Sequence, residues 1–291
     1  MMLLFLACTS PEQTGFASYD WVDEYETPEY LNDTLIQPYG MTAFQDGFLV
    51  MDRGASSLVY VKGENSEILA EEIVGSYFSE GETGLLLGGD QEIYTIDSDG
   101  NPSVWLDDVI SPSAITQVGE DVFWIEEGDV WSFNGVERIL IDADFRNPYD
   151  LIYWDGSLWI ATQGDNALWK YDLVNPPAKM VSLDDDPHRL AIGDEGLWIT
   201  TRSSRWPYGG WIVFFDGENS EKITQTPPEP EWVSFYQDQV IWSSKQSITA
   251  YTEDSYEMLA LQARVGSMFV QDGHLYWTDQ QAGKLGFLAL E

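Results

Sequence analysis

Residues 275–279, Leu-Tyr-Trp-Thr-Asp, form one copy of an apolar signature that recurs along the chain. Each copy is a short run of aliphatic and aromatic residues, and a turn residue or an acid usually stands just before it. Short apolar runs bounded by turn residues are typical of buried β-strands. The other copies begin at Phe48, Leu85, Val122, Leu158, Leu197 and Val240.

The spacing of these copies predicts the fold. Measured from the residue before each copy, the repeats lie 34 to 43 residues apart, which suits one four-stranded propeller blade each. Turns such as Asp99-Gly100 and Asn134-Gly135 separate the third strand of a unit from the fourth. We therefore predict an all-β, seven-bladed β-propeller over residues 29–291. The second strand of unit two, 84–88, is the weakest, and a six-bladed ring is the alternative if that unit is an insertion.

The two ends of the predicted domain complement each other. The last unit has three strands, at 267–271, 275–279 and 285–290, and the chain then ends. Tyr30–Gln37, just before the first inner strand, has the pattern of a strand with no blade of its own. Pairing it with 285–290 removes an exposed sheet edge. We therefore expect an N-terminal strand to complete the last blade and close the ring.

One motif connects the repeat to known proteins. Tyr276-Trp277-Thr278-Asp279 is the YWTD motif, and the pattern Pro38…Asp46-Gly47…Asp52 looks like an NHL-type unit. Over about residues 29–291 the chain thus resembles the broad group of YWTD, NHL and SMP-30-type β-propellers. The literal motif occurs once, and YWTD propellers usually have six blades, whereas seven units are present here.

The N-terminus resembles a bacterial lipoprotein signal. Residues 1–7 are an apolar run ending in Ala7, directly before Cys8, the one cysteine of the chain. The resemblance implies that Cys8 is lipidated, and more than one acyl chain gives stable anchoring. No Lys or Arg precedes the run, which is short for such a signal, and a frayed apolar terminus is the alternative. Residues 9–28 are polar and acidic, and we expect them to form a tether to the bacterial cell envelope, on the periplasmic or surface side of the outer membrane.

The charge balance restricts the partners. The chain has 50 acidic and 13 basic residues and a net charge of −37. A nucleic-acid binder needs a positive surface to release counterions, so nucleic acid is not expected as a partner. Anionic lipid is excluded in the same way, which leaves the lipid anchor as the only membrane contact. Such charge also favours a monomer. Adaptation to a salty medium explains the acids best, with binding of multivalent cations as the alternative.

Strand direction assigns the turns to two faces. Crossovers between blades, and turns between second and third strands, emerge on one face, termed the top face. His188 opens an inner strand and belongs at the top, whereas His274 follows a turn at the bottom. Two histidines that lie on opposite faces cannot share a metal centre. No Gly-rich phosphate loop, HExxH or paired CxxC is present in the sequence.

Four polar residues form the best channel-mouth cluster of the predicted top face. They are Asn147, Asp150, His188 and Glu231, from the inner strands of blades four to six. Oxygen and imidazole donors on neighbouring strands suit a divalent cation such as Ca²⁺ or Mg²⁺. The set looks similar in residue type to the metal ligands of SMP-30-type lactonases, and streptogramin-inactivating lyases also use His and Glu near a channel mouth. This likeness implies catalysis, with Asp150, His188 and Glu231 as candidates. A polar rim satisfied by water is the alternative.

Six of the seven arginines belong to the predicted top face. The longest turn there, 202–210, also carries Trp206 and Tyr208. Arginine offers a planar fork for carboxylate or phosphate groups, and loops on rigid scaffolds commonly bind ligands. An Arg–acid network is the alternative. The predicted ligand contacts are Arg53, Arg189, Arg202, Arg205, Trp206 and Tyr208.

Three functions follow, in order of preference. The first is an envelope-anchored binding module for a small molecule, glycan or peptide on the top face. The second is a metal-assisted hydrolase, lactonase-like, or a lyase. The third is a structural partner in an envelope assembly. The one-sided arginines favour binding over catalysis.

Overall fold

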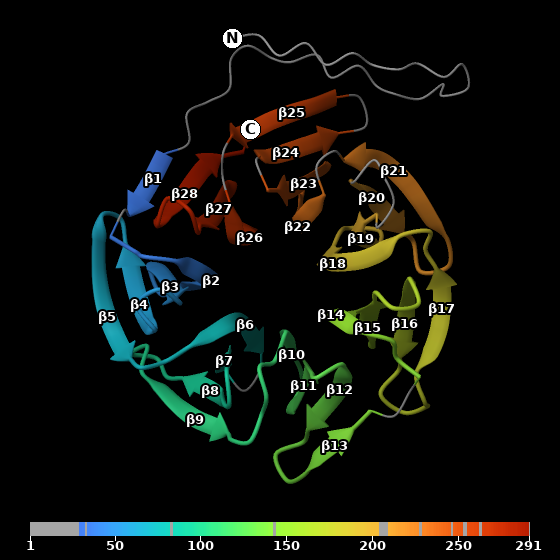
Figure 1. Ribbon diagram of the computed structural model, residues 1–291, viewed down its shortest axis with the longest axis horizontal. Coiled ribbons are helices and arrows are strands. Elements are labelled where there is room, and N and C mark those ends of the chain that lie inside the picture. The colour runs from blue at the N-terminus through green and yellow to red at the C-terminus, as the bar shows by residue number, and fades with distance from the viewer. Residues whose placement is uncertain are drawn as a thin grey trace.

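The computed structural model describes residues 29–32, 34–81, 84–141, 144–203, 209–226, 229–245, 247–252, 255–261 and 264–290. In these residues the chain forms 28 β-strands, which pair into seven four-stranded antiparallel sheets. The sheets stand around one axis like the blades of a propeller (Figure 1). The predicted seven-bladed β-propeller is confirmed. Within the described residues no helix is long and apolar enough to cross a membrane.

The blades follow one another along the chain, and each runs from its inner strand to its outer strand. Blade 1 has β2 (Pro38–Phe44), β3 (Gly47–Asp52), β4 (Ser57–Lys62) and β5 (Asn65–Glu71). Blade 2 has β6 (Gly75–Gly81), β7 (Gly84–Gly89), β8 (Ile93–Ile96) and β9 (Pro102–Leu106). Blade 3 has β10 (Ala114–Val118), β11 (Asp121–Glu126), β12 (Asp129–Phe133) and β13 (Arg138–Leu140). Blade 4 has β14 (Pro148–Trp154), β15 (Ser157–Thr162), β16 (Ala167–Tyr171) and β17 (Ala178–Ser182).

The remaining blades keep this order. Blade 5 has β18 (Asp186–Ile192), β19 (Leu197–Arg202), β20 (Gly210–Phe215) and β21 (Ser220–Thr226). Blade 6 has β22 (Pro230–Tyr236), β23 (Gln239–Ser244), β24 (Ser247–Thr252) and β25 (Ser255–Leu261). Blade 7 has β26 (Val265–Gln271), β27 (His274–Asp279), β28 (Lys284–Ala289) and, outermost, β1 (Glu29–Asn32). Strand β7 pairs with both β6 and β8, so the six-bladed alternative is wrong.

Ring closure occurs as predicted, but with a shorter strand. β1 pairs antiparallel with β28, and Tyr30 lies opposite Gly286. The expected strand Tyr30–Gln37 ends at Asn32 in the structure. The reason is tertiary, because the backbone N–H groups of Ile36 and Gln37 donate to the carboxylate of Asp52, at 2.7 and 2.8 Å. The lipoprotein signal ending at Cys8 and the tether 9–28 lie outside the described residues.

The hydrophobic core is divided among the contacts between neighbouring blades. Trp159 of blade 4, for example, packs with Leu197 and Ile199 of blade 5, and all three are buried. Burying one such large side chain contributes about 1.5–3 kcal/mol. The recurring apolar signature is therefore the set of second strands, which pack against the next blade.

The inner strands contain β-bulges, which can position side chains for a site. A β-bulge or register shift interrupts pairing near the start of β2, β6, β14, β18, β22 and β26, whereas the register of β10 is continuous. A bulge turns a side chain out of the regular alternation of the strand. Most blades can thus direct a side chain toward the propeller axis near the top face.

Candidate functional site

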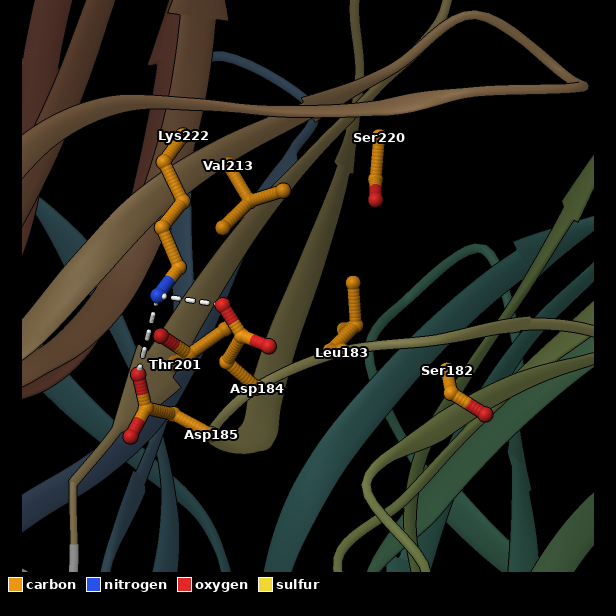
Figure 2. A pocket seen from close by; sticks show the side chains of 8 residues that line it. All are labelled: Ser182, Leu183, Asp184, Asp185, Thr201, Val213, Ser220 and Lys222. Atoms are coloured by element: carbon orange, nitrogen blue, oxygen red, sulfur yellow. Dashed lines mark ion pairs between the residues drawn. The ribbon is translucent and has the colours of Figure 1, made fainter.

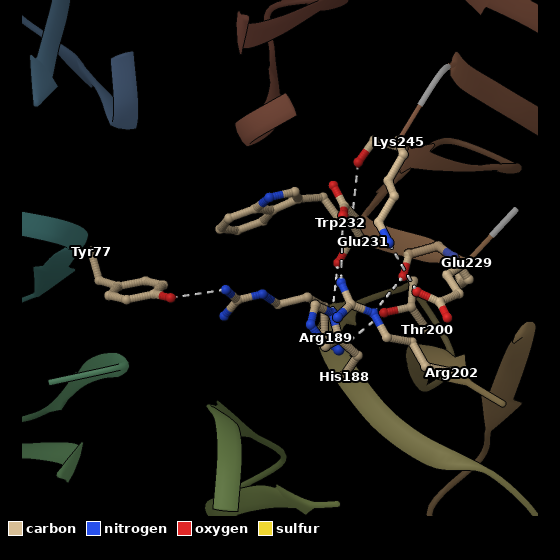
Figure 3. Close-up of polar contacts among 11 residues, drawn as sticks. Tyr77, His188, Arg189, Thr200, Arg202, Glu229, Glu231, Trp232 and Lys245 are labelled. Atoms are coloured by element: carbon tan, nitrogen blue, oxygen red, sulfur yellow. Dashed lines mark hydrogen bonds and ion pairs between the residues drawn. The ribbon is translucent and has the colours of Figure 1, made fainter. Parts of the chain in front are cut away.

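Side chains from five inner strands gather at the propeller axis near the top face, and we term them the axial cluster. Arg189 of β18 is the centre of this cluster, and Figure 3 shows it extending away from its own strand toward Tyr77 of β6. Its Nη2 donates to the phenol oxygen of Tyr77 at 3.0 Å. The axial cluster comprises Tyr39, Tyr77, Tyr149, Asp150, Arg189 and Trp232, which come from β2, β6, β14, β18 and β22.

Aromatic rings surround the guanidinium of Arg189. Its central carbon lies 5.2 Å from the ring centroid of Tyr77, 5.1 Å from that of Tyr149 and 4.3 Å from that of Trp232. Desolvated cation–π contacts of this kind each contribute up to about 2 kcal/mol. The side chain is 6% exposed. Arg189, which we expected to contact a ligand directly, is therefore a buried hub that joins blades 2, 4, 5 and 6.

Asp150 balances the buried charge. Its Oδ1 lies 3.4 Å from Nη1 of Arg189, and its Oδ2 accepts the N–H of Leu190 at 2.9 Å. Burial raises the pKa of Asp150, while Arg189 and the Leu190 amide oppose that rise. Burial alone would lower the pKa of Arg189, but Tyr77 and Asp150 reverse this and leave it raised. The Arg189 guanidinium therefore stays charged, and its contacts with Asp150 and Tyr77 fix its position.

His188 lies beside this hub as a neutral imidazole. Its Nδ1 donates to the carbonyl oxygen of Glu231 at 3.0 Å, and its ring lies 4.2 Å from that of Tyr149. Burial, together with the charges of Arg189 and Arg202, lowers its pKa to about 2. Within the described part of the chain its Nε2 is buried without a partner. Only 3% of the residue is exposed, so a substrate does not reach this nitrogen in the present conformation.

The four predicted metal ligands do not come together. Asn147 donates from Nδ2 to Gln163 at 3.0 Å, Asp150 binds Arg189, and His188 binds a carbonyl group. The carboxylate of Glu231 lies 3.6 Å from Nη2 of Arg202. Among the described residues no three His, Cys, Asp or Glu side chains are arranged to hold a metal ion. Because each donor has another partner, the residues present do not fit a resident divalent cation.

Arg53 and Arg202, two of the predicted ligand contacts, lie at the rim of the axial cluster, where their guanidinium groups make long contacts. The guanidinium of Arg53 lies over the ring of Tyr39 at 4.7 Å and 3.9 Å from Asp90. Arg202 donates from Nε to the Pro230 carbonyl at 3.4 Å, besides its ion pair with Glu231. Their side chains are 36% and 30% exposed. Both guanidinium groups therefore keep donors that an arriving anion can use. Arg205, Trp206 and Tyr208 lie outside the described residues.

Two phenol hydroxyls complete the donor set. Tyr39 and Tyr149 point into the axial cluster, and no described residue hydrogen-bonds to either phenol oxygen. Burial raises the pKa of both phenols. They therefore remain protonated at neutral pH and can donate. Hydroxyl donors next to a fixed guanidinium are the groups that recognise a carboxylate or phosphate.

These tyrosines were not predicted from the sequence, although a signal for them is present. Several inner strands have proline as their first or second residue, and the axial residue follows one or two positions later: Pro38-Tyr39, Pro148-Tyr149, Pro187-His188-Arg189 and Pro230-Glu231-Trp232. Proline suits this place because it needs no ladder partner for its nitrogen. The pattern identifies the axial position once the inner strands are known.

Apart from the axial cluster, a cavity lies between the outer parts of blades 4 and 5 (Figure 2). It is a polar cavity of about 110 Å³. Nζ of Lys222 lies 2.9 Å from Asp184 and 3.6 Å from Asp185, and 4.7 Å from the ring of Trp211. These ion pairs connect β21 to the crossover between the two blades. The lining residues are Ser182, Leu183, Asp184, Asp185, Thr201, Val213, Ser220 and Lys222.

Comparison with known proteins supports the fold. No family model matches the sequence, and no curated protein sequence matches it. Among solved structures, a streptogramin B lyase is 15% identical with a TM-score of 0.75, covering 91% of this chain and 97% of its own. The chain is similar in fold to seven-bladed propellers. YCF48 bound to D1 peptide is 13% identical with a TM-score of 0.69, covering 92% and 96%. A gluconolactonase from Xanthomonas campestris is 14% identical with a TM-score of 0.57, covering 90% and 89%.

Proposed function

We propose that this protein is a binding module that seats an anionic group, such as a carboxylate, of a small molecule, glycan or peptide over the axial cluster. One observation carries the proposal. The phenol hydroxyls of Tyr39 and Tyr149 have no described partner. The ring of Tyr149 contacts the Arg189 guanidinium, which Asp150 and three aromatic rings hold at a fixed position, and Tyr39 interacts with the same charge electrostatically. Such a preorganised donor set binds with little loss of side-chain entropy.

The rim arginines extend this site. Within the described part of the chain, the guanidinium groups of Arg53 and Arg202 contact oxygen atoms at 3.4 Å or more, so an anion can replace a weak contact by a shorter one. Hydrogen bonds to charged groups contribute about 1.5–3 kcal/mol each. Arg205, Trp206 and Tyr208 of the long top-face turn remain proposed contacts. The protein as proposed is a monomer, attached to the bacterial envelope through lipid on Cys8.

The propellers of similar fold support binding and catalysis alike, since they include a peptide complex, a lyase and a gluconolactonase. The arrangement of this chain favours binding. Its top-face histidine, His188, is buried, and the predicted donors of a metal are engaged elsewhere. The phenols of Tyr39 and Tyr149 and the guanidinium groups of Arg53 and Arg202 are hydrogen-bond donors, which recognise a ligand without acting as a base.

A thermal-shift measurement tests the proposal. The purified protein is heated with citrate, glucuronate or glucose 6-phosphate, and with glucose as the neutral control. We expect at least one anion to raise Tm. The double variant Tyr39→Phe/Tyr149→Phe should weaken its binding by about tenfold or more, the loss of about one charge-assisted hydrogen bond.

Tyr60→Phe is the matched control, because Tyr60 donates to Asp46 on the opposite face. It removes the same atom at a remote place and should leave the affinity unchanged. The proposal fails if none of the anions raises Tm of the wild-type protein. It also fails if the double variant binds as tightly as Tyr60→Phe.

A further inference from the structure

Three inner-strand bulges are held by a side-chain hydroxyl from the neighbouring second strand. The backbone N–H of Arg189 donates to Oγ1 of Thr200 at 3.0 Å, and that of Trp232 donates to Oγ of Ser243 at 3.2 Å. In blade 7 the N–H of Ser267 donates to Oγ1 of Thr278 at 2.9 Å. The same arrangement thus recurs in three consecutive blades.

The three hydroxyls occupy one position of the repeat. Thr200, Ser243 and Thr278 are each the fourth residue of the apolar signature, in Leu197–Thr200, Val240–Ser243 and Leu275–Thr278. All three are fully buried, with 0% exposure. A hydroxyl at a buried position must have a partner, and the bulged N–H group provides one.

In blades 5 and 6 the hydroxyl-held bulge lies at the residue that reaches the axis. In β18 the residues Pro187 and Arg189 pair with the consecutive residues Thr201 and Thr200, so one extra residue is accommodated. The residue whose N–H is captured by the hydroxyl, Arg189 in β18 and Trp232 in β22, is the one that joins the axial cluster. The unbulged strand β10 contributes no residue to the cluster, and in the bulged strand β26 the corresponding residue is the small Ser267, which does not belong to it.

The bulge also leaves an N–H group without a ladder partner. Leaving a buried N–H group without a hydrogen-bond partner strongly destabilises the folded state. The hydroxyls of Thr200 and Ser243 therefore stabilise the bulged geometry over the regular one, and a regular register would turn the side chains away from the axis.

We infer that Thr200 and Ser243 are positioning residues, whose hydroxyls hold the bulges that place Arg189 and Trp232 in the axial cluster. Neither residue touches a ligand. Their role in binding rests on the proposed function, whereas their effect on the position of Arg189 does not.

The experiment compares Thr200→Val with two matched variants. Thr200→Ser keeps the hydroxyl. Thr201→Val makes the same substitution one residue along β19, where Thr201 bonds the backbone of Trp211 on the opposite side of the strand. Each protein is treated with phenylglyoxal, which modifies accessible guanidinium groups, and modification at Arg189 is quantified by peptide mass mapping. Trp fluorescence confirms that each variant is folded, and the affinity for citrate is measured in parallel.

We expect Thr200→Val to increase modification of Arg189 by about fivefold or more, the factor that corresponds to one hydrogen bond. Thr200→Ser and Thr201→Val should stay at the wild-type level. If Arg189 in folded Thr200→Val is as protected as in the wild type, or if Thr201→Val exposes it equally, the inference is overturned. The modification measurement needs no ligand, so absence of citrate binding in the wild type would count against the proposed function alone.

Discussion

Replacement of Arg189 by methionine tests whether the buried guanidinium holds the centre of the ring. Methionine fills much of the same volume without charge. It leaves Asp150, whose side chain is 13% exposed, without its counterion and removes the bond to Tyr77. Breaking a buried ion pair on one side typically costs about 3–5 kcal/mol. For a domain of this size each kcal/mol lowers Tm by about 2–4 °C, so we expect Tm to fall by roughly 6–20 °C at pH 7.

The loss of stability in Arg189→Met should change with pH in a defined direction. Burial raises the pKa of Asp150, and in the variant the guanidinium no longer opposes that rise. The pKa in the folded state then lies above the unfolded value of about 3.9. Since the folded variant takes up a proton more readily than the unfolded chain, its loss of stability should shrink as the pH falls. Calorimetric scans at pH 7 and pH 5 measure this difference.

Two further variants complete the design. Arg189→Met/Asp150→Asn removes both charges and should recover much of the lost stability. Arg53→Met breaks a part-exposed pair with Asp90 at 3.9 Å, and exposed pairs contribute about 0–1 kcal/mol. The reasoning is refuted if Arg189→Met is no less stable than Arg53→Met, or if its deficit is the same at both pH values.

Three other predictions concern closure, a turn and the anchor. A methyl group at Gly286 would overlap the indole of Trp277, so Gly286→Ala should lower the free energy of unfolding by about 1–3 kcal/mol; an unchanged Tm would contradict the packing. Hydrogen bonds from Asn175 and the backbone lower the pKa of Asp172 to about 2, so its stabilising effect is present above about pH 4 and is lost as the pH falls toward 2. An NMR titration of this carboxyl group should show a higher midpoint in Asn175→Ala, and an unmoved midpoint would exclude the side-chain bond as the cause. Cys8→Ser should move the protein from the membrane to the soluble fraction of expressing cells, whereas persistent membrane attachment would count against lipidation.

The fold was predictable because the sequence features that define it repeat along the chain. The recurring signature located the second strands, and one strand too few at the end matched one extra strand at the beginning. The end of β1 at Asn32 was not predictable, because it depends on Asp52, a residue of another blade, accepting the N–H groups of Ile36 and Gln37. A capping interaction between blades has no local sequence signal.

The location of the site was predictable from the sequence, but the contacts among its residues were not. Strand direction put Asp150, His188 and Glu231 on the inner strands β14, β18 and β22, which are neighbours in the structure. It did not show that Asp150 pairs with Arg189, or that Glu231 pairs with Arg202. The inner-strand bulges shift the side chains by one position, and such a shift decides between contact with a neighbour and contact with the axis.

The strand that closes the ring also sets the order in which the protein can be completed. β1 leaves the ribosome before any blade exists, and its partner β28 is made about 250 residues later. Contacts so distant in sequence form slowly, because a long loop must be closed first. Until β28 has been made, β1 has no partner in blade 7, and an uncovered edge invites pairing with other chains. Chains that are cut short near the C-terminus should therefore be prone to aggregation even though most of their blades are intact.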